Sequence, residues 1–370
     1  MVGRRLFCAW GLASATGACA LVAGLEDKSL SDVSPDGASA VEAGASDGAG
    51  DAPSTSEVIL SGLSRPLALA ADPTSLYFSE ATGAIKKLRK GERVPVLMAS
   101  EQYVPSQIVL DAEFVYWRNA NSPRVKPNGP EFQAVARMEK VRDADSGAPM
   151  GLFRRNANDE EPVRSIALFD PVTGAAEDTM FYTESDRVGR KARSFEGGFN
   201  TVVNNQKSPG AVAVGARHVY WVTAGDYSIR RQLKNPMGVD GGPPPGPELV
   251  HASPDRVSAL ELALDDTHVY WLDQLGRVLR RVQDGSAEAE LLGTSEATSG
   301  GALVVGPARV FWTNTDRGTV TVVPKDGDPA AQRVLATGQK RPTGVALDPF
   351  ATPPRLYWLT EDTLSTTAVP

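Results

Sequence analysis

Few residues of this chain are equipped for acid–base or metal chemistry. Its 370 residues include three histidines, and two of them, His218 and His268, each begin the same string, His-Val-Tyr-Trp. Equivalent places in different repeats lie far apart, so this recurrence indicates a polar residue at a strand start. A shared metal or acid–base site is the alternative role for such histidines. The third, His251, has no visible partner in the sequence.

Nucleophile and phosphate motifs are also absent. The only cysteines are Cys8 and Cys19, so the chain after residue 57 has no thiol for a disulfide, a metal or catalysis. The sequence contains no Gly-x-Ser-x-Gly elbow, His-Glu-x-x-His pair or P-loop. We therefore predict no catalytic residues, no cofactor and no metal ligands.

An aromatic pair recurs seven times after residue 57, and its second position holds five of the six tryptophans. The pairs are Tyr77-Phe78, Tyr116-Trp117, Phe181-Tyr182, Tyr220-Trp221, Tyr270-Trp271, Phe311-Trp312 and Tyr357-Trp358. Each pair follows a short apolar run that ends in Asp or Gly, two residues suited to tight turns. The aromatic strands are apolar at successive positions, as expected of strands covered on both faces. We expect the tryptophans to belong to the core.

Two further apolar runs follow many of the pairs, which makes four strands per repeat. The 314 residues from 57 to 370 give seven repeats of about 45 residues, the length of a four-stranded propeller blade. We therefore predict an all-β, seven-bladed β-propeller over 57–370. Six blades plus an insertion is the alternative, because Trp117 and Tyr182 lie 65 residues apart.

The two ends of this region complement each other. The last repeat, 342–370, has three strands, and residues 57–62 resemble an unpaired fourth strand. We predict that 57–62 complete the last blade, because pairing removes two open strand edges.

The repeat resembles the YWTD and NHL group of β-propellers. The stretches that carry the resemblance are PTGVALDP at 342–349 with LYW at 356–358, YWLD at 270–273 and FWTN at 311–314. Only Asp273 keeps the final Asp of the signature. The resemblance implies binding of a protein, glycan or small molecule, or a metal-dependent gluconolactonase-like hydrolase. The hydrolases place Glu, Asn and Asp ligands at the channel mouth, and Asn119, Glu184, Asp273 and Asn314 follow the aromatic strands here. A role as blade-turn residues explains these four equally well.

The amino terminus has the layout of an export signal. Arg4 and Arg5 precede an apolar run from Leu6 to about Ala15, and small residues then lead to Cys19. The end of this signal resembles the lipobox of bacterial lipoproteins, which implies lipidation of Cys19, although Thr16 stands where that family prefers Leu. Ala18-Cys19-Ala20 is also a cleavage site for plain secretion, and 6–25 is long enough for an uncleaved anchor. Each interpretation places the body outside the cytoplasm.

Residues 20–56 read as a spacer. They contain almost no large apolar side chains between 38 and 56, and 26–56 carry a net charge of −6. Such a segment cannot bury enough surface to order itself, and its charges keep it extended. We predict a signal peptide at 1–19, a disordered acidic tether at 20–56 and the propeller at 57–370.

Charge gives little sign of a polyanionic partner. The chain has a net charge of −7, mostly from the tether, so we predict no nucleic-acid binding. Paired cations recur in third strands, at Lys86-Lys87, Arg190-Lys191, Arg230-Arg231 and Arg280-Arg281. One member of each pair is expected to face a neighbouring blade and the other solvent. Three insertions, at 119–132, 139–150 and 235–248, are candidate binding loops.

These observations favour a non-enzymatic binding or interaction module. We expect a monomer anchored in the bacterial cell envelope, at the outer membrane or cell surface, through an N-terminal lipid. A secreted protein is the alternative location. The alternative functions are the metal-dependent hydrolase and a subunit of an envelope assembly.

Overall fold

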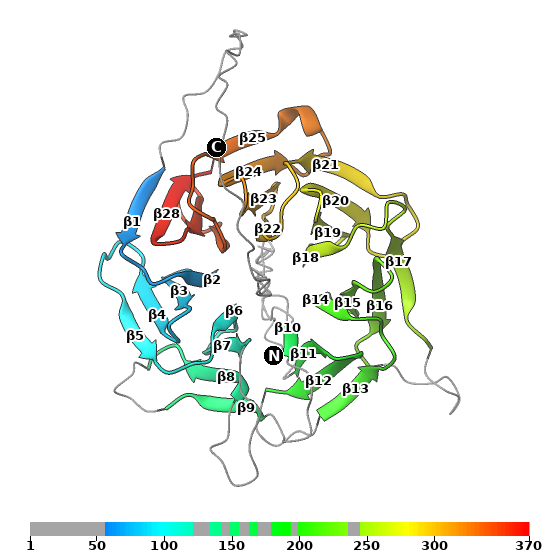
Figure 1. Ribbon diagram of the computed structural model, residues 1–370, viewed down its shortest axis with the longest axis horizontal. Coiled ribbons are helices and arrows are strands. Elements are labelled where there is room, and N and C mark those ends of the chain that lie inside the picture. The colour runs from blue at the N-terminus through cyan, green and yellow to red at the C-terminus, as the bar shows by residue number, and fades with distance from the viewer. Residues whose placement is uncertain are drawn as a thin grey trace, which may run out of the picture.

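The computed structural model describes residues 56–120, 133–142, 148–154, 163–168, 179–193, 199–235 and 245–369. Seven four-stranded antiparallel sheets stand around a central axis (Figure 1). In six of them the strands follow chain order from the axis to the rim. The predicted all-β seven-bladed propeller is therefore confirmed.

The first three blades run from residue 66 to residue 203. Blade 1 is β2 (Pro66–Ala71), β3 (Ser75–Glu80), β4 (Ile85–Arg89) and β5 (Val96–Ala99). Blade 2 is β6 (Pro105–Leu110), β7 (Phe114–Asn119), β8 (Gln133–Glu139) and β9 (Met150–Arg154). Blade 3 is β10 (Val163–Leu168), β11 (Thr179–Glu184), β12 (Arg187–Ala192) and β13 (Phe199–Val203). Because β8 and β9 complete a blade between Trp117 and Tyr182, the six-blade alternative is wrong.

The remaining blades follow the same plan. Blade 4 is β14 (Pro209–Val214), β15 (His218–Thr223), β16 (Ser228–Leu233) and β17 (Glu248–Ala252). Blade 5 is β18 (Ala259–Leu264), β19 (His268–Asp273), β20 (Arg277–Val282) and β21 (Glu290–Thr294). Blade 6 is β22 (Leu303–Val305), β23 (Arg309–Asn314), β24 (Thr319–Pro324) and β25 (Arg333–Ala336), with a short 3₁₀ turn, η4 (Pro329–Ala331), before β25.

Blade 7 joins the two ends of the propeller. Strands β26 (Val345–Asp348), β27 (Arg355–Leu359) and β28 (Thr363–Ala368) come from the carboxyl end, and β1 (Glu57–Ser61) pairs antiparallel with β28. Leu60 of β1 is buried beside Leu364. The predicted ring closure is confirmed. Within the described ranges, the structure has no helix long and apolar enough to span a membrane.

The aromatic pairs explain why the blades pack face to face. All fourteen pair residues are at most 5% exposed, as expected of core residues. Successive strand residues point to opposite faces, so the first aromatic of one blade meets the second aromatic of the next. Tyr77 shares a cluster with Trp117, Tyr220 with Trp271, and Phe78 closes the ring against Tyr357. Each interface therefore contains at least two large buried rings.

Candidate functional site

The histidines singled out by their repeated string are strand residues. His218 and His268 begin β15 and β19, and each ring lies against the tyrosine two positions later, with centroids 6.2 and 6.0 Å apart. They occupy equivalent places in adjacent blades, as the sequence predicts.

The polar residues after the aromatic strands hold turns. Oδ1 of Asp273 accepts hydrogen bonds from the amides of Leu275 and Arg277, and Oδ1 of Asn314 accepts from Asp316 and Arg317. Asn119 is likewise buried, and Glu184 forms an ion pair with Arg187 across its turn. Among the residues that the structure describes, no group of three or more His, Cys, Asp or Glu side chains is arranged to hold a metal ion.

The paired cations of the third strands are occupied between blades. Lys87 donates to the carbonyl of Lys140, Arg190 to that of Lys234, and Arg231 to that of Gln283. Each bond reaches the next blade, at distances of 2.7 to 2.9 Å. Arg280 contacts the carbonyl of Lys325 in the same way. One member of each pair faces the neighbouring blade, as predicted. The prediction that the other member faces solvent is wrong for Lys191, which is buried, and for Arg281, which donates to Val250 of blade 4.

Other predicted features lie largely outside the described residues. These are Cys19, the tether at 20–56 and most of the insertions at 119–132, 139–150 and 235–248.

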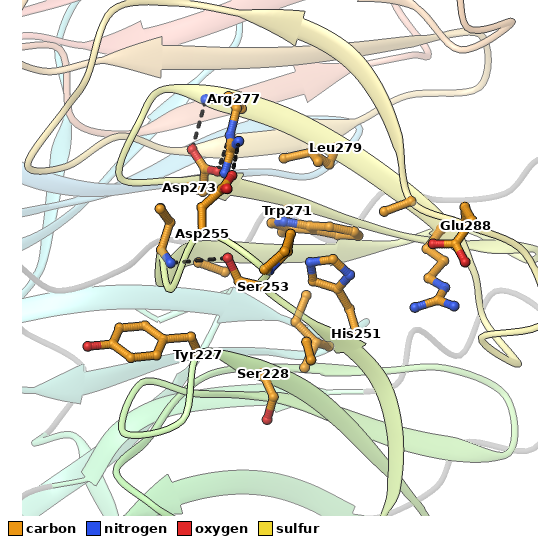
Figure 2. A pocket seen from close by; sticks show the side chains of 17 residues that line it. Tyr227, Ser228, His251, Ser253, Asp255, Trp271, Asp273, Arg277, Leu279 and Glu288 are labelled. Atoms are coloured by element: carbon orange, nitrogen blue, oxygen red, sulfur yellow. Dashed lines mark hydrogen bonds and ion pairs between the residues drawn. The ribbon is translucent and has the colours of Figure 1, made fainter.

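A cavity of about 360 Å³ opens between blades 4 and 5 (Figure 2). Strand β17 and the loop after it form one side, and β19 and β20 form the other. The indole of Trp271 lies in the middle, with His251 beside it and Arg277 at one end. The volume falls within the usual range for small-molecule sites. We take this cavity as the candidate functional site.

The same place is filled by a glutamine in three other blades. The indole Nε1 of Trp117 donates to Gln102, that of Trp221 to Gln206 and that of Trp358 to Gln339, at 2.9, 3.1 and 2.9 Å. Each glutamine lies in the loop that enters the blade from its predecessor, and its own amide N–H bonds to the preceding blade's second turn. The equivalent residue before blade 5 is Ser253, whose N–H donates to Tyr227 O.

A shorter loop accounts for the difference. In the glutamine blades, one residue with positive φ precedes the glutamine: Glu101 at 59°, Asn205 at 58° and Gly338 at 65°. In those loops two residues separate the glutamine from the strand residue that pairs with Ile85, Val188 or Val320. The equivalent pair of blade 4 is Ile229–His251, and only Ala252 lies between His251 and Ser253. Ser253 also turns its hydroxyl to the amide of Val257 at 3.1 Å.

The tryptophan of blade 5 consequently keeps an unused donor. The side chain of Trp271 is 3% exposed, and its Nε1 forms no hydrogen bond with any described residue. Trp312, which follows the short loop at Ser295, also has an unbonded Nε1, but that atom is buried. Since Trp271 lines the cavity, its N–H is available to a molecule that enters.

His251 forms the second wall of the cavity. Its ring lies 4.8 Å from that of Trp271 at an interplanar angle of 36°. The equivalent strand positions next to Trp117 and Trp358 carry Ala99 and Ala336. Burial lowers the pKa of His251, and the nearby Arg281 and Arg277 lower it further. The imidazole is therefore neutral at physiological pH.

The two guanidinium groups of the cavity are held by different partners. Arg277 bonds to Asp273 at 2.7 Å and to Asp255 at 2.8 Å. Burial acts to lower the pKa of Arg277, but these two carboxylates raise it overall, so the guanidinium stays charged. Arg281, which also lines the cavity, donates to the backbone carbonyls of Val250, Gly285 and Ala287. The centre, by contrast, offers neutral aromatic surface.

Sequence reasoning singled out Asp273 for a different role and set His251 aside. The signal that marks the cavity is a missing residue: the strings SEQ at 100–102, NNQ at 204–206 and TGQ at 337–339 share a glutamine that Ala252-Ser253 lacks. Alignment of the loops between repeats would have found it.

The comparisons with known proteins bear on the fold alone. No protein-family model matches the chain, and no curated protein matches it. Among solved structures, the computationally designed Ika8 protein is 14% identical, with a TM-score of 0.54 over 84% of this chain and 99% of that one. A nidogen/laminin complex structure is 15% identical, with a TM-score of 0.49 over 70% of this chain and 92% of that one.

Proposed function

We propose that this protein is a non-enzymatic binding module of the bacterial cell envelope whose ligand occupies the cavity between blades 4 and 5. The observation that carries the binding role is the unbonded N–H of Trp271 inside a cavity that other blades fill with glutamine. Nε1 of Trp271 meets the cavity without an acceptor among the described residues, so a ligand that accepts from it adds a hydrogen bond that the protein does not make itself.

The envelope location is supported by the sequence. The Arg4-Arg5 start, the apolar run and the small residues before Cys19 favour export and lipidation. The acidic segment at 20–56 would then hold the propeller away from the membrane surface. A single lipid-anchored body with an open cavity fits capture or sensing of a small molecule outside the cytoplasm.

Ligand-observed NMR tests the binding role. The purified protein is screened against a panel of small polar metabolites, together with Trp271→Phe and the matched control Trp358→Phe. We expect at least one compound to bind the wild type and the control, to lose binding to Trp271→Phe, and to be recovered unchanged. Conversion of the compound, or binding that Trp271→Phe leaves intact for every hit, contradicts the proposal.

Metabolic labelling tests the location. Cells that express the full chain are fed an alkyne analogue of palmitate. The wild type and Cys8→Ala should be labelled and Cys19→Ala should not. Equal labelling of Cys19→Ala would exclude a lipid at that residue and leave the binding role unaffected.

A further inference from the structure

The three glutamines show what kind of group fits beside the indole. Each presents its Oε1 to the tryptophan N–H. Its Nε2 donates back to the carbonyl two residues earlier, at 2.9 to 3.0 Å for Gln102, Gln206 and Gln339. The occupant of this place is therefore a planar, uncharged amide that accepts on one side and donates on the other.

The cavity before blade 5 contains side-chain groups that could form hydrogen bonds with such an amide. The donor, Nε1 of Trp271, is retained, while the amide that would meet it is missing. His251 adds a neutral imidazole, which offers one donor and one acceptor nitrogen, and neither nitrogen is bonded to a described residue. A polar neutral group can thus be held from two sides.

The charges of the cavity disfavour an anion. Asp255, Asp273 and Glu288 line it against the cations Arg277 and Arg281. Both carboxylates that touch Arg277 neutralise it, and the N–H groups of Arg281 bond to three backbone carbonyls. Arg281 has no carboxylate partner among the described residues, but the three carboxylates of the lining outnumber the two guanidinium groups, so the net charge of the cavity is negative and disfavours an anionic ligand.

Resting on the proposed function, we infer that the ligand carries an uncharged amide group, whose carbonyl oxygen accepts from Trp271 Nε1 in the place that glutamine fills in blades 2, 4 and 7. A cavity of about 360 Å³ has room for the amide and for the part of the molecule that bears it. The amide can come from a glutamine side chain of a short peptide or from the acetamido group of an amino sugar.

Isothermal titration calorimetry on the full-length protein in detergent distinguishes these sources. The probes are Gly-Gln-Gly with the matched Gly-Glu-Gly and Gly-Met-Gly, and N-acetylglucosamine with the matched glucose. We expect one amide probe to bind at least tenfold more tightly than its matched probes, and the arm in which this occurs identifies the source. Trp271→Phe should weaken that probe about tenfold, because one buried hydrogen bond is lost, whereas Trp358→Phe should have no effect.

A self-filled variant provides a second readout. Inserting a glycine before Ser253 and changing Ser253→Gln restores the loop of the glutamine blades, so it should abolish binding of the amide probe and raise the melting temperature. Equal binding of amide and carboxylate probes, binding of neither amide, or binding that survives the filled loop overturns the inference. The metabolite screen with Trp271→Phe then reports separately whether the cavity binds another class of ligand.

Discussion

The ammonium group of Lys90 lies 2.6 Å from a carboxylate oxygen of Asp348, and this ion pair joins blade 1 to blade 7. Three further pairs repeat the relationship: Lys140–Asp72 at 3.0 Å, Arg193–Asp111 at 2.5 Å and Lys325–Asp265 at 2.5 Å. In each, the carboxylate lies in the first turn of one blade and the cation follows the third strand of the next.

Two other junctions that the structure describes differ from this pattern at both of the paired positions. Gly215 replaces the carboxylate of blade 4, and the matching residue of blade 5 is Gln283. Gly306 replaces it in blade 6, and the matching residue of blade 7 is Val369. A buried charge without a partner is strongly destabilising, which explains why an acid and its base are present or absent together.

Substitutions of Lys90 and Asp348, which join blade 1 to blade 7, should therefore have non-additive effects on the free energy of unfolding. Lys90→Val alone leaves Asp348, which is 3% exposed, without its counter-ion, and we expect a loss of about 3–5 kcal/mol in the free energy of unfolding. The double variant Lys90→Val/Asp348→Gly reproduces the pair found between blades 6 and 7 and should recover part of that loss. Urea unfolding of the wild type, both single variants and the double variant measures the coupling. Additive losses would show that the two side chains act independently.

The same ion pairs predict that the folded state loses stability at low pH. Burial by itself raises the pKa of Asp72, but hydrogen bonds from the backbone of Thr74 and the charge of Lys140 outweigh it and lower the pKa to about 2. A lowered pKa gives stability that is complete above the unfolded value near 4 and is lost as pH falls towards 2.

We expect the melting temperature to fall between pH 4 and pH 2, and to fall less in the double variant Asp72→Gly/Lys140→Gln, which matches the pair of blades 4 and 5. The contribution of Asp72 is on the order of 1–2 kcal/mol after solvent screening. An unchanged acid profile in this variant would rule out Asp72 as a contributor.

Burial of the tyrosines should be visible at high pH. Burial raises the pKa of Tyr270 well above its ordinary value near 10, and its hydrogen bond to Asp265 raises it further. Because the folded state holds this proton, stability is present below pH 10 and declines above it. In a spectrophotometric titration, absorbance of Tyr270 as phenolate should appear only with unfolding, so that Tyr270→Phe removes signal from the unfolding step. If Tyr270→Phe instead removed absorbance from the transition near pH 10, the phenol of Tyr270 would be accessible to solvent in the folded protein.

Ring closure gives a prediction about truncation. A chain that starts at Ser54 keeps β1, whereas one that starts at Pro66 lacks it and exposes the edge of β28 together with Leu364, which is buried beside Leu60. We expect the shorter chain to melt at a much lower temperature or to aggregate, and the longer chain to behave like the full mature protein. Thermal melts of both decide the matter, and equal stability would mean that β1 does not close the ring.

The hydrogen bonds between the tryptophans and their glutamine partners should contribute measurably to the free energy of unfolding. Gln339→Ala leaves the indole N–H of Trp358 without its acceptor, so we expect a loss of about 1–3 kcal/mol. In the Trp358→Phe background the same change should cost less, since no N–H remains to be satisfied. A double-mutant cycle by urea unfolding measures the difference. Equal costs in both backgrounds would assign the effect of Gln339 to packing alone.

The blade pattern could be predicted from the sequence because it repeats. Tyr270-Trp271 and its six counterparts give the second strands, Asp265 and its counterparts give the first turns, and the spare strand at 57–61 gives the closure. Each signal occurs several times with the same physical cause, so chance resemblance at one place has little effect.

The cavity could not be predicted in the same way, because it arises where a repeated element is missing. The place of Ser253 has no meaning by itself and must be compared with those of Gln102, Gln206 and Gln339 in the other loops. The contact of His251 with Trp271 likewise depends on packing between two blades, which sequence spacing does not reveal. Asp273, a candidate ligand only under the hydrolase alternative, holds a turn and pairs with Arg277.

Hydrogen exchange of the indole N–H groups tests most directly whether the place beside Trp271, which glutamine fills in blades 2, 4 and 7, is open. The five propeller tryptophans give separate cross-peaks in a ¹⁵N–¹H spectrum, and single Trp→Phe variants assign them. We predict that the N–H of Trp271 exchanges with solvent much faster than those of Trp117, Trp221 and Trp358, which are bonded to glutamine, and than that of the buried Trp312. Exchange of Trp271 as slow as that of the three bonded indoles would contradict the account, because the donor would then be covered and no open place would exist for a ligand.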